Sequence, residues 1–210
     1  MTFTGKEQKK IMSSIDKIPE HLRGILQAIG MLYEESNFPG KVHHERTASL
    51  DVKFSAGCMV NFDRWVSADQ HNDYFGKTVL AAYNTMMVKI MLDDKVIYNK
   101  PMGNEVVDFH YDFSDNAEHT YNLKIIVDGP FNKLSKQYKD HGFVSHMLKI
   151  HDVHIENLSM SKLLEGQGFC FFDDAPATKN VWANLMGKPG CQQFEFSTPI
   201  YTWLLSSIDS

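Results

Sequence analysis

The segment His119-Thr-Tyr-Asn-Leu-Lys-Ile-Ile-Val-Asp-Gly-Pro130 carries the strongest structural pattern in this chain. Its odd-numbered residues from Tyr121 to Val127 are all apolar, and the residues between them are polar except for Ile126. Successive side chains point to opposite faces of a β-strand, so this alternation predicts a strand with one buried face. Asp128-Gly-Pro130 predicts the turn that ends it.

Further strands are predicted on both sides of this segment. Met86 to Leu92 and Lys95 to Tyr98 flank Asp93-Asp94, an arrangement typical of a β-hairpin. The parity of the apolar positions changes within residues 147–156, which predicts a β-bulge near Asp152. We expect a polar loop over residues 132–146 and a long loop before the last strand. The other strand patterns cover residues 47–54, 106–113, 147–156, 169–172 and 193–197.

The N-terminal part of the chain has a different period. Apolar side chains recur every three to four residues from Ile11 to Leu32, which predicts helices, and Pro39-Gly40 ends them. We expect a helical segment over residues 1–40 and a β domain over residues 41–210. Several short strands in series without long helices between them predict a mainly β fold, an antiparallel β-sandwich or jelly roll. Thr198-Pro199 predicts a short C-terminal helix or an extended tail.

The composition limits the classes of partner. The 210 residues include 43% hydrophobic side chains and carry a net charge of −5 without a long run of Lys or Arg, so we expect no nucleic-acid partner. No segment has the roughly 18–20 continuous apolar residues of a membrane span, and the N-terminus lacks the apolar core of a signal peptide, so we expect no membrane association. Cys58, Cys170 and Cys191 predict reduced thiols, with a Cys170–Cys191 bridge as the alternative.

The local motifs of nucleophilic catalysis and of phosphate binding are absent. The chain has no Gly-x-Ser-x-Gly and no Gly-x-Gly-x-x-Gly. The adjacent acids Asp93-Asp94 and Asp173-Asp174 fall in predicted turns, where carboxylates are usually solvated. His151 and His154 project to opposite faces of a strand unless the bulge restores their parity, so we expect surface histidines rather than metal ligands. The prediction is a protein without catalytic residues, cofactor or metal, and not an enzyme; an enzyme acting on polysaccharide is an alternative.

Three segments of the C-terminal half resemble a family of phage proteins. They are His119–Gly129, Met147–Glu156 and the tail Gln193-Phe-Glu-Phe-Ser-Thr-Pro-Ile-Tyr-Thr-Trp-Leu-Leu205. Their succession is similar to small β-sandwich proteins of marine tailed phages, especially myoviruses of cyanobacteria, and the tail motif is its specific part. The resemblance covers roughly residues 86–208. It implies a jelly-roll architecture like that of carbohydrate-binding modules and a place in a phage particle.

The function expected first is that of a virion structural protein, a component of the tail, baseplate, fibre or neck that is made in the host cytoplasm. Its partners would be other virion proteins within an oligomeric particle. We expect the assembly surface on the apolar side of the N-terminal helices and on the aromatic tail. The assembly candidates are Ile11, Ile15, Leu22, Leu26, Ile29, Tyr201 and Trp203.

The alternative function is a glycan-binding module that recognises a polysaccharide of the host surface. Sugars are held by aromatic ring faces together with planar polar side chains on a rigid support. Two predicted loops bring such residues together, one around residue 63 and one before the last strand. The glycan-binding candidates are Phe62, Asp63, Trp65, Tyr74, Asp173, Asp174, Asn180 and Trp182. For any one of the aromatic residues, a place in the core is the competing interpretation.

Overall fold

A computed structural model of the chain describes residues 46–70, 75–115, 119–138, 142–161, 169–172, 175–179, 182–201 and 203–204. For residues 132, 133, 138, 169–172 and 175–179 it describes the backbone alone. All described residues belong to one compact unit, Arg46–Ser210. The predicted helical segment of residues 1–40 lies outside the described residues, as do residues 41–45 at the start of the predicted β domain.

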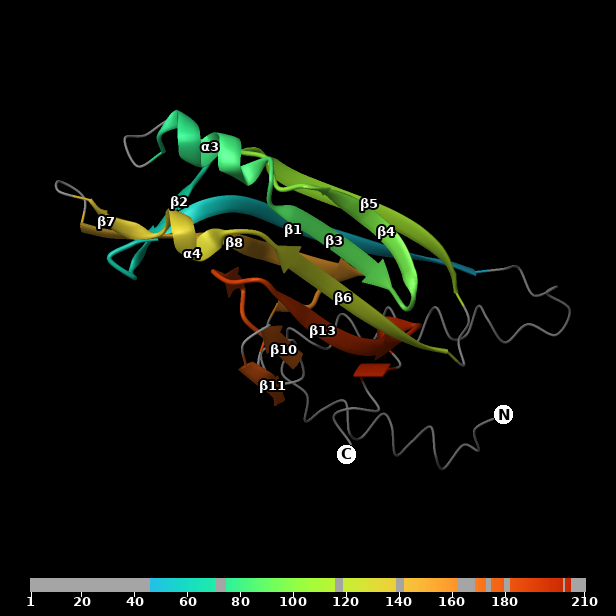
Figure 1. Ribbon diagram of the computed structural model, residues 1–210. Coiled ribbons are helices and arrows are strands. Elements are labelled where there is room, and N and C mark those ends of the chain that lie inside the picture. The colour runs from blue at the N-terminus through green and yellow to red at the C-terminus, as the bar shows by residue number, and fades with distance from the viewer. Residues whose placement is uncertain are drawn as a thin grey trace, which may run out of the picture. The chain divides into compact units, whose positions relative to one another are not determined.

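The described unit is an antiparallel β-sandwich, which confirms the predicted fold class (Figure 1). The first sheet, sheet A, is seven-stranded and has two long neighbouring strands at its centre, β1 (Arg46–Val60) and β8 (Gly142–Ile155). On the side away from β8, β1 pairs with β2 (Arg64–Ser67) and β5 (Val106–Asp115). On the side away from β1, β8 pairs with β7 (Lys136–Tyr138), β9 (Leu158–Ser159) and β12 (Leu185–Met186).

The second sheet, sheet B, is six-stranded and contains the segment from which the fold was predicted. Its strands follow in the order β11 (Ala175–Lys179), β10 (Phe169–Phe172), β13 (Gly190–Ser197), β6 (Thr120–Asp128), β3 (Met87–Leu92) and β4 (Lys95–Pro101). The predicted hairpin is formed by β3 and β4, which turn at Asp93-Asp94. Two short helices, α3 (Lys77–Tyr83) and α4 (Phe131–Leu134), precede β3 and follow β6.

The core fills the space between the two sheets. In β6, the four alternating residues Tyr121, Leu123, Ile125 and Val127 are all buried, as the sequence pattern predicts. Aromatic side chains join the two layers, because the ring of Phe54 in β1 contacts that of Tyr98 in β4 at a centroid distance of 5.6 Å. Removing this much apolar surface from water is the main stabilising contribution to such a fold.

The predicted β-bulge is confirmed. The register of β1 and β8 shifts between Lys53 and Phe54, since Lys53 pairs with Asp152 whereas Phe54 pairs with Ile150. His151 is the extra residue. The bulge keeps both Ile150 and Val153 in the core, although their positions differ in parity.

The prediction of a polar loop over residues 132–146 is wrong. This segment holds the end of α4, all of β7 and the beginning of β8. Because Ser145 and His146 are polar, the sequence of this segment lacks the pattern of a strand. His146 is nevertheless fully buried and pairs with Cys58 of β1. Tertiary pairing therefore overrides the local polarity.

Several elements are absent from the sequence prediction. β2 lies where a loop was expected around Trp65, and α3 follows it. The long loop before the last strand contains β11 and β12. These strands have between two and five residues, which is too short for an alternating pattern to stand out. Among the described residues, no helix is long and apolar enough to cross a membrane.

The structure tests the prediction of reduced thiols only in part. Cys58 carries a free thiol that is fully buried, and this burial raises its pKa to about 12. A thiol with such a pKa stays protonated at neutral pH and is a weak nucleophile. The side chain of Cys170, on which the alternative bridge depends, lies outside the described residues.

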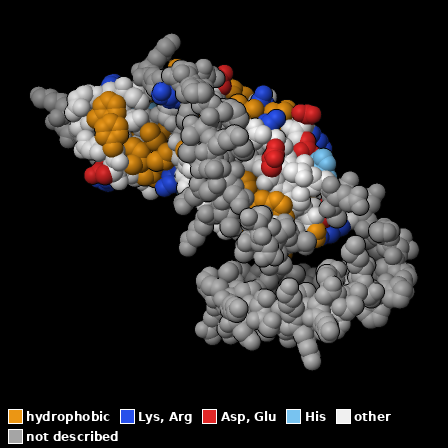
Figure 2. Space-filling view, turned by 90° about the horizontal axis from the view of Figure 1, so that it is seen from below, with side chains coloured by type: hydrophobic (Ala, Val, Ile, Leu, Met, Phe, Trp, Pro, Cys, Tyr) orange, Lys and Arg blue, Asp and Glu red, His pale blue; other side chains and the backbone are white. Residues whose placement is uncertain are grey.

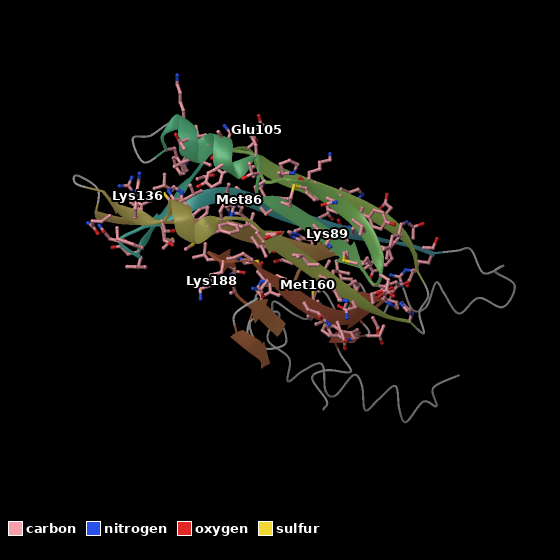
Figure 3. The ribbon with its side chains drawn as sticks, in the orientation of Figure 1. Met86, Lys89, Glu105, Lys136, Met160 and Lys188 are labelled. Carbon is pink, nitrogen blue, oxygen red and sulfur yellow. The ribbon has the colours of Figure 1, made fainter. Side chains whose placement is uncertain are left out.

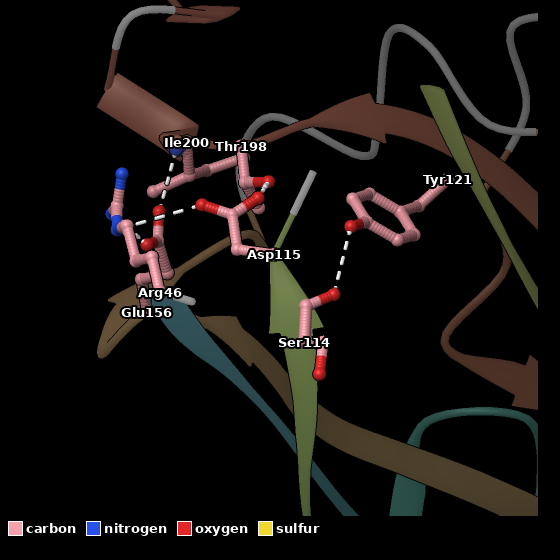
Figure 4. A network of polar contacts seen from close by, with 7 residues as sticks. All are labelled: Arg46, Ser114, Asp115, Tyr121, Glu156, Thr198 and Ile200. Atoms are coloured by element: carbon pink, nitrogen blue, oxygen red, sulfur yellow. Dashed lines mark hydrogen bonds and ion pairs between the residues drawn. The ribbon is translucent and has the colours of Figure 1, made fainter. Parts of the chain in front are cut away.

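A short helical turn follows β13, as predicted from Thr198-Pro199, and a network of polar contacts holds its start (Figure 4). The Thr198 hydroxyl donates to the carboxylate of Asp115 in β5. The backbone N–H of Ile200 donates to Glu156 Oε2 at 2.6 Å, so Glu156 satisfies a helix N-terminal donor that has no partner within the helix. Arg46 pairs with both carboxylates. The network joins the ends of β1, β5 and β8 to the C-terminal segment.

Candidate functional site

The outer face of sheet A carries a group of aromatic side chains near one end of the sandwich. In β8 the even-numbered residues from Val144 to Ile150 are buried in the core, so Phe143 and Met147 face outward. Met59 of β1 has the same outward parity, and Trp65 of β2 pairs with it. We call Phe62, Trp65 and Phe143, with Met59 and Met147 beside them, the aromatic platform.

Trp65 lies flat against the strand beside it. A Cβ atom added to Gly57 in β1 would be 2.4 Å from Cζ2 of the Trp65 ring, so only glycine leaves room for the indole at this place. Lys149 of β8 lies over the ring, with its Nζ 5.3 Å from the ring centroid. The Trp65 Nε1 atom has no hydrogen-bond partner among the described residues.

Phe62 projects from the tight turn between β1 and β2. It is 71% exposed, which is unusual for a large apolar side chain. The turn is strained, because Asn61 and Phe62 have φ values of 51° and 67°, a region that bulky side chains rarely adopt. Two contacts fix it to β8: Asn61 N donates to Phe143 O at 2.8 Å, and Phe143 N donates to Asn61 Oδ1 at 3.0 Å.

The same contacts bring two rings together. Phe62 and Phe143 stack with their centroids 5.0 Å apart and an angle of 19° between their planes. This geometry leaves a flat apolar surface at the end of the sandwich. Figure 2 shows hydrophobic side chains gathered at its left-hand end, the end at which Figure 1 places β2 and β7, with Lys or Arg side chains at several points around them.

Polar groups continue the outer face of sheet A beyond Trp65. Ser55 of β1 lies between Ser67 of β2, whose hydroxyl is 3.4 Å away, and His151, whose Nε2 is 2.8 Å from the Ser55 Oγ. Partial burial lowers the pKa of His151, and the charges of Lys149 and Lys53 lower it further, while Asp69 acts in the opposite direction. Ser55 and Ser67 are buried, at 1% and 8% exposure, so their hydroxyls bond within the sheet. The partly exposed imidazole of His151 is the group of these three that can meet a ligand next to the aromatic platform.

The bulge also determines whether His151 and His154 project to the same face of β8. It gives His151 and His154 the same outward direction, which is the condition under which they could share an ion. His151 instead contacts Ser55, and the Nε2 of His154 lies 3.6 Å from Asp152 Oδ2. Among the described residues, no group of three or more His, Cys, Asp and Glu side chains is placed to hold a metal ion.

The predicted glycan-binding residues have different locations. Phe62, Asp63 and Trp65 lie together at the turn and in β2, and Asp63 is exposed. Trp182 is only 7% exposed and packs in the main core cluster, with its Nε1 donating to Asn184 Oδ1 at 2.9 Å. It cannot offer an open ring face to a sugar, so the core interpretation is correct for this residue. Tyr74, Asp173, Asp174 and Asn180 lie outside the described residues.

Sequence reasoning missed Phe143 and Lys149 as members of the surface. Both come from β8, and only the pairing of β1 with β8 brings them beside Trp65. The one available signal is the odd-numbered apolar residues Phe143 and Met147, which lie within the segment expected to be a loop or at its border.

The assembly candidates are also divided. Tyr201 and Trp203 are half-buried and pack against the core of this unit, and the Trp203 ring meets Phe194 edge-on at 5.5 Å. The tail therefore covers part of its own sandwich. Ile11, Ile15, Leu22, Leu26 and Ile29 lie outside the described residues. A role of these residues in virion assembly stays a prediction.

A second group of aromatic and charged side chains lines a cleft of about 430 Å³ between the β3–β4 turn, β5 and β6. Its polar groups already have partners within the chain. Lys95 Nζ donates to the Tyr111 hydroxyl at 2.7 Å, and Asp93 Oδ1 accepts from Asn122 N at 2.8 Å. The aromatic platform, with its exposed Phe62, is the stronger candidate for a binding surface.

Comparisons with known proteins give no family. No family model matches the chain, and no curated protein matches it. A solved structure described as "vCBM60 in complex with galactobiose" is similar at 7% identity and a TM-score of 0.38, over 70% of this chain and 96% of that chain. The selenomethionine form of vCBM60, whose description concerns "calcium-dependent carbohydrate binding modules", is similar at 7% identity and a TM-score of 0.36, over 70% of this chain and 89% of that chain. Likenesses at these TM-scores carry no argument about the ligand of this chain.

Proposed function

We propose that the β-sandwich is a non-catalytic glycan-binding module and that the aromatic platform is its binding surface. The observation that carries the proposal is the arrangement of Phe62, Phe143 and Trp65 along one end of an outer sheet face. An exposed group of large apolar side chains with a polar margin is typical of a ligand or partner surface.

The chemistry of the surface suits a sugar chain. The C–H faces of a pyranose ring pack on aromatic rings, and its hydroxyl groups need nearby donors and acceptors. Trp65 and the Phe62–Phe143 pair supply the rings, and the partly exposed side chains of Lys149 and His151 supply polar groups on the same face. All of these residues are held by paired strands or by a fixed turn, so little conformational entropy is lost when a ligand binds.

The proposal is tested by glycan-array screening of the full-length protein, followed by titration calorimetry with any glycan that binds. Trp65→Ala and Phe62→Ala should each weaken binding by about tenfold or more, which corresponds to about 1.4 kcal/mol. Val96→Ala is the matched control, because Val96 is also an exposed apolar residue but lies in β4 at the edge of sheet B. Equal binding by all four proteins, or no binding to any glycan, would overturn the proposal.

A further inference from the structure

We infer that the ligand of the aromatic platform is an anionic glycan, with a carboxylate or sulfate on the sugar that stacks on Trp65. This inference rests on the proposed function and adds the chemical class of the ligand. Its basis is the position of Lys149, whose ammonium group lies over the Trp65 ring at 5.3 Å from the centroid, while Gly57 packs closely against the same indole.

Lys149 has no carboxylate within salt-bridge distance among the described residues. Its neighbour Lys53, by contrast, is paired with Asp108 at 3.4 Å. Within the described part of the chain, the contact of the Lys149 ammonium is the Trp65 ring, at 5.3 Å. No described carboxylate therefore neutralises this lysine beside the aromatic platform.

Charged side chains of both signs surround Lys149. Burial lowers the pKa of His151, and the positive charges of Lys149 and Lys53 lower it further, whereas Asp69 raises it. The charge of Lys149 therefore acts on the outer face of β8 beside Trp65. Lys136 and Lys188 lie toward the end of the sandwich that carries β7 and β2 (Figure 3). Asp63 is exposed in the turn beside Phe62, so Lys149, which lies over Trp65 itself, is the cation on which the inference depends.

The contact between Lys149 and Trp65 also favours anionic over neutral sugars. A pyranose ring can stack on the face of Trp65 that Lys149 covers only if the ammonium group moves from above the ring toward its rim. With a neutral sugar, the cation–π contact is lost and no charge replaces it. A carboxylate or sulfate projects from the rim of a sugar ring, so Lys149 gains a charge-assisted hydrogen bond when it moves.

Two matched pairs of polymers test the inference: polygalacturonate with its carboxyl-reduced form, and dextran sulfate with dextran. Affinity of the full-length protein is measured for each polymer at low and at high salt. We expect the wild type to bind the anionic member of at least one pair at least tenfold more tightly than its neutral partner at low salt. This ratio should fall at high salt, because screening weakens the ion pair.

Two lysine variants identify the responsible charge. Lys149→Met should reduce the ratio to about one, whereas Lys53→Met, which removes a lysine already paired with Asp108 on the same face, should preserve it. Circular dichroism and the urea midpoint confirm that both variants fold. A ratio near one in the wild type, or a ratio that survives in Lys149→Met, would overturn the inference. Binding to neutral glycans alone would leave the proposed function in place, whereas no binding to these polymers or to the glycan array would remove both.

Discussion

His146 and Tyr83 form a buried polar pair beside the core. The Nδ1 atom of His146 is 2.6 Å from the Tyr83 hydroxyl oxygen, and that hydroxyl donates to the carbonyl oxygen of Gly57 at 3.0 Å. In this arrangement the Nδ1–H donates to Tyr83, and Nε2 is left without a partner among the described residues. Burial lowers the pKa of His146 to about 4, and the charge of Lys136 adds to the effect. The imidazole is therefore neutral in the folded protein at neutral pH.

This pair predicts a loss of stability in mild acid. Because the folded-state pKa lies below the ordinary value of 6.5, the unfolded chain takes up a proton on His146 at a higher pH than the folded chain does. The free energy of unfolding should fall as the pH falls from about 6.5 toward 4, by about 3 kcal/mol in total from this residue. Urea unfolding at a series of pH values measures it.

His146→Leu isolates this contribution from those of the other titrating groups. The pKa of His151 is lowered and that of His110 is raised, so the difference between wild type and variant, rather than either curve alone, reports on His146. We expect the variant to show a flatter profile between about pH 6.5 and 4.5. Parallel profiles for the two proteins would show that the histidine is not held neutral.

The C-terminal helical turn depends on a carboxylate from another element. Glu156 follows β8 and accepts the Ile200 N–H, while Arg46 at the start of β1 pairs with it. The side chain of Asp115, which binds Arg46 and Thr198, is only 2% exposed. Buried carboxylates of this kind require partners, because an unpaired one costs several kcal/mol. The tail that carries Trp203 is thus attached by polar contacts as well as by apolar packing.

We predict that Glu156→Ala destabilises the sandwich by about 1–3 kcal/mol, since it leaves the Ile200 N–H without its acceptor and Arg46 with Asp115 as its remaining partner. Glu156 has a φ of 49°, and glutamate and alanine both carry a Cβ, so the backbone cost of this conformation is about the same in both and the loss reports on the contacts of the carboxylate. Glu156→Gln keeps an oxygen that can accept from the Ile200 N–H. Its free energy of unfolding should therefore fall by less than half as much as that of the alanine variant. The midpoint of urea unfolding gives both values, and equal midpoints for the alanine variant and the wild type would contradict the prediction.

The β domain should fold without the N-terminal segment. All the described residues of its core cluster lie between Ala48 and Trp203. We predict that deletion of residues 1–38 leaves a cooperatively unfolding protein with the circular dichroism of a β-sandwich. If the N-terminal helices carry assembly, light scattering will show a smaller mass for the deletion variant than for the full chain. An insoluble or unfolded product would contradict the prediction.

The strands were predictable wherever one face is buried over many residues. The alternation in β6 and the acidic turn between β3 and β4 are local patterns, and both appear in the structure. β2 was missed because it has four residues, and the start of β8 was missed because Ser145 and His146 give it a polar appearance. Burial of His146 depends on Tyr83, which is remote in sequence.

The candidate site was predictable only in part. Phe62, Asp63 and Trp65 are neighbours in sequence, so their grouping needed no knowledge of the fold. Phe143 and Lys149 reach the same surface through the pairing of β1 with β8, which no local pattern reveals. Trp182 is surrounded in the sequence by residue types that are common in binding loops, but its side chain lies in the core. A large indole contributes more to stability when it packs in the core than when it is exposed.

The position of β1 at the centre of sheet A has a consequence for biosynthesis. Leu50 pairs on one side with Tyr111 and on the other with Ile155, so β1, the first of the described strands in chain order, obtains its neighbours only after more than a hundred further residues have been translated. Such non-local contacts slow folding, and an apolar strand that waits for partners is prone to intermolecular association. Slower translation of the codons after residue 60 would lengthen that interval, and soluble yield in expression should fall accordingly.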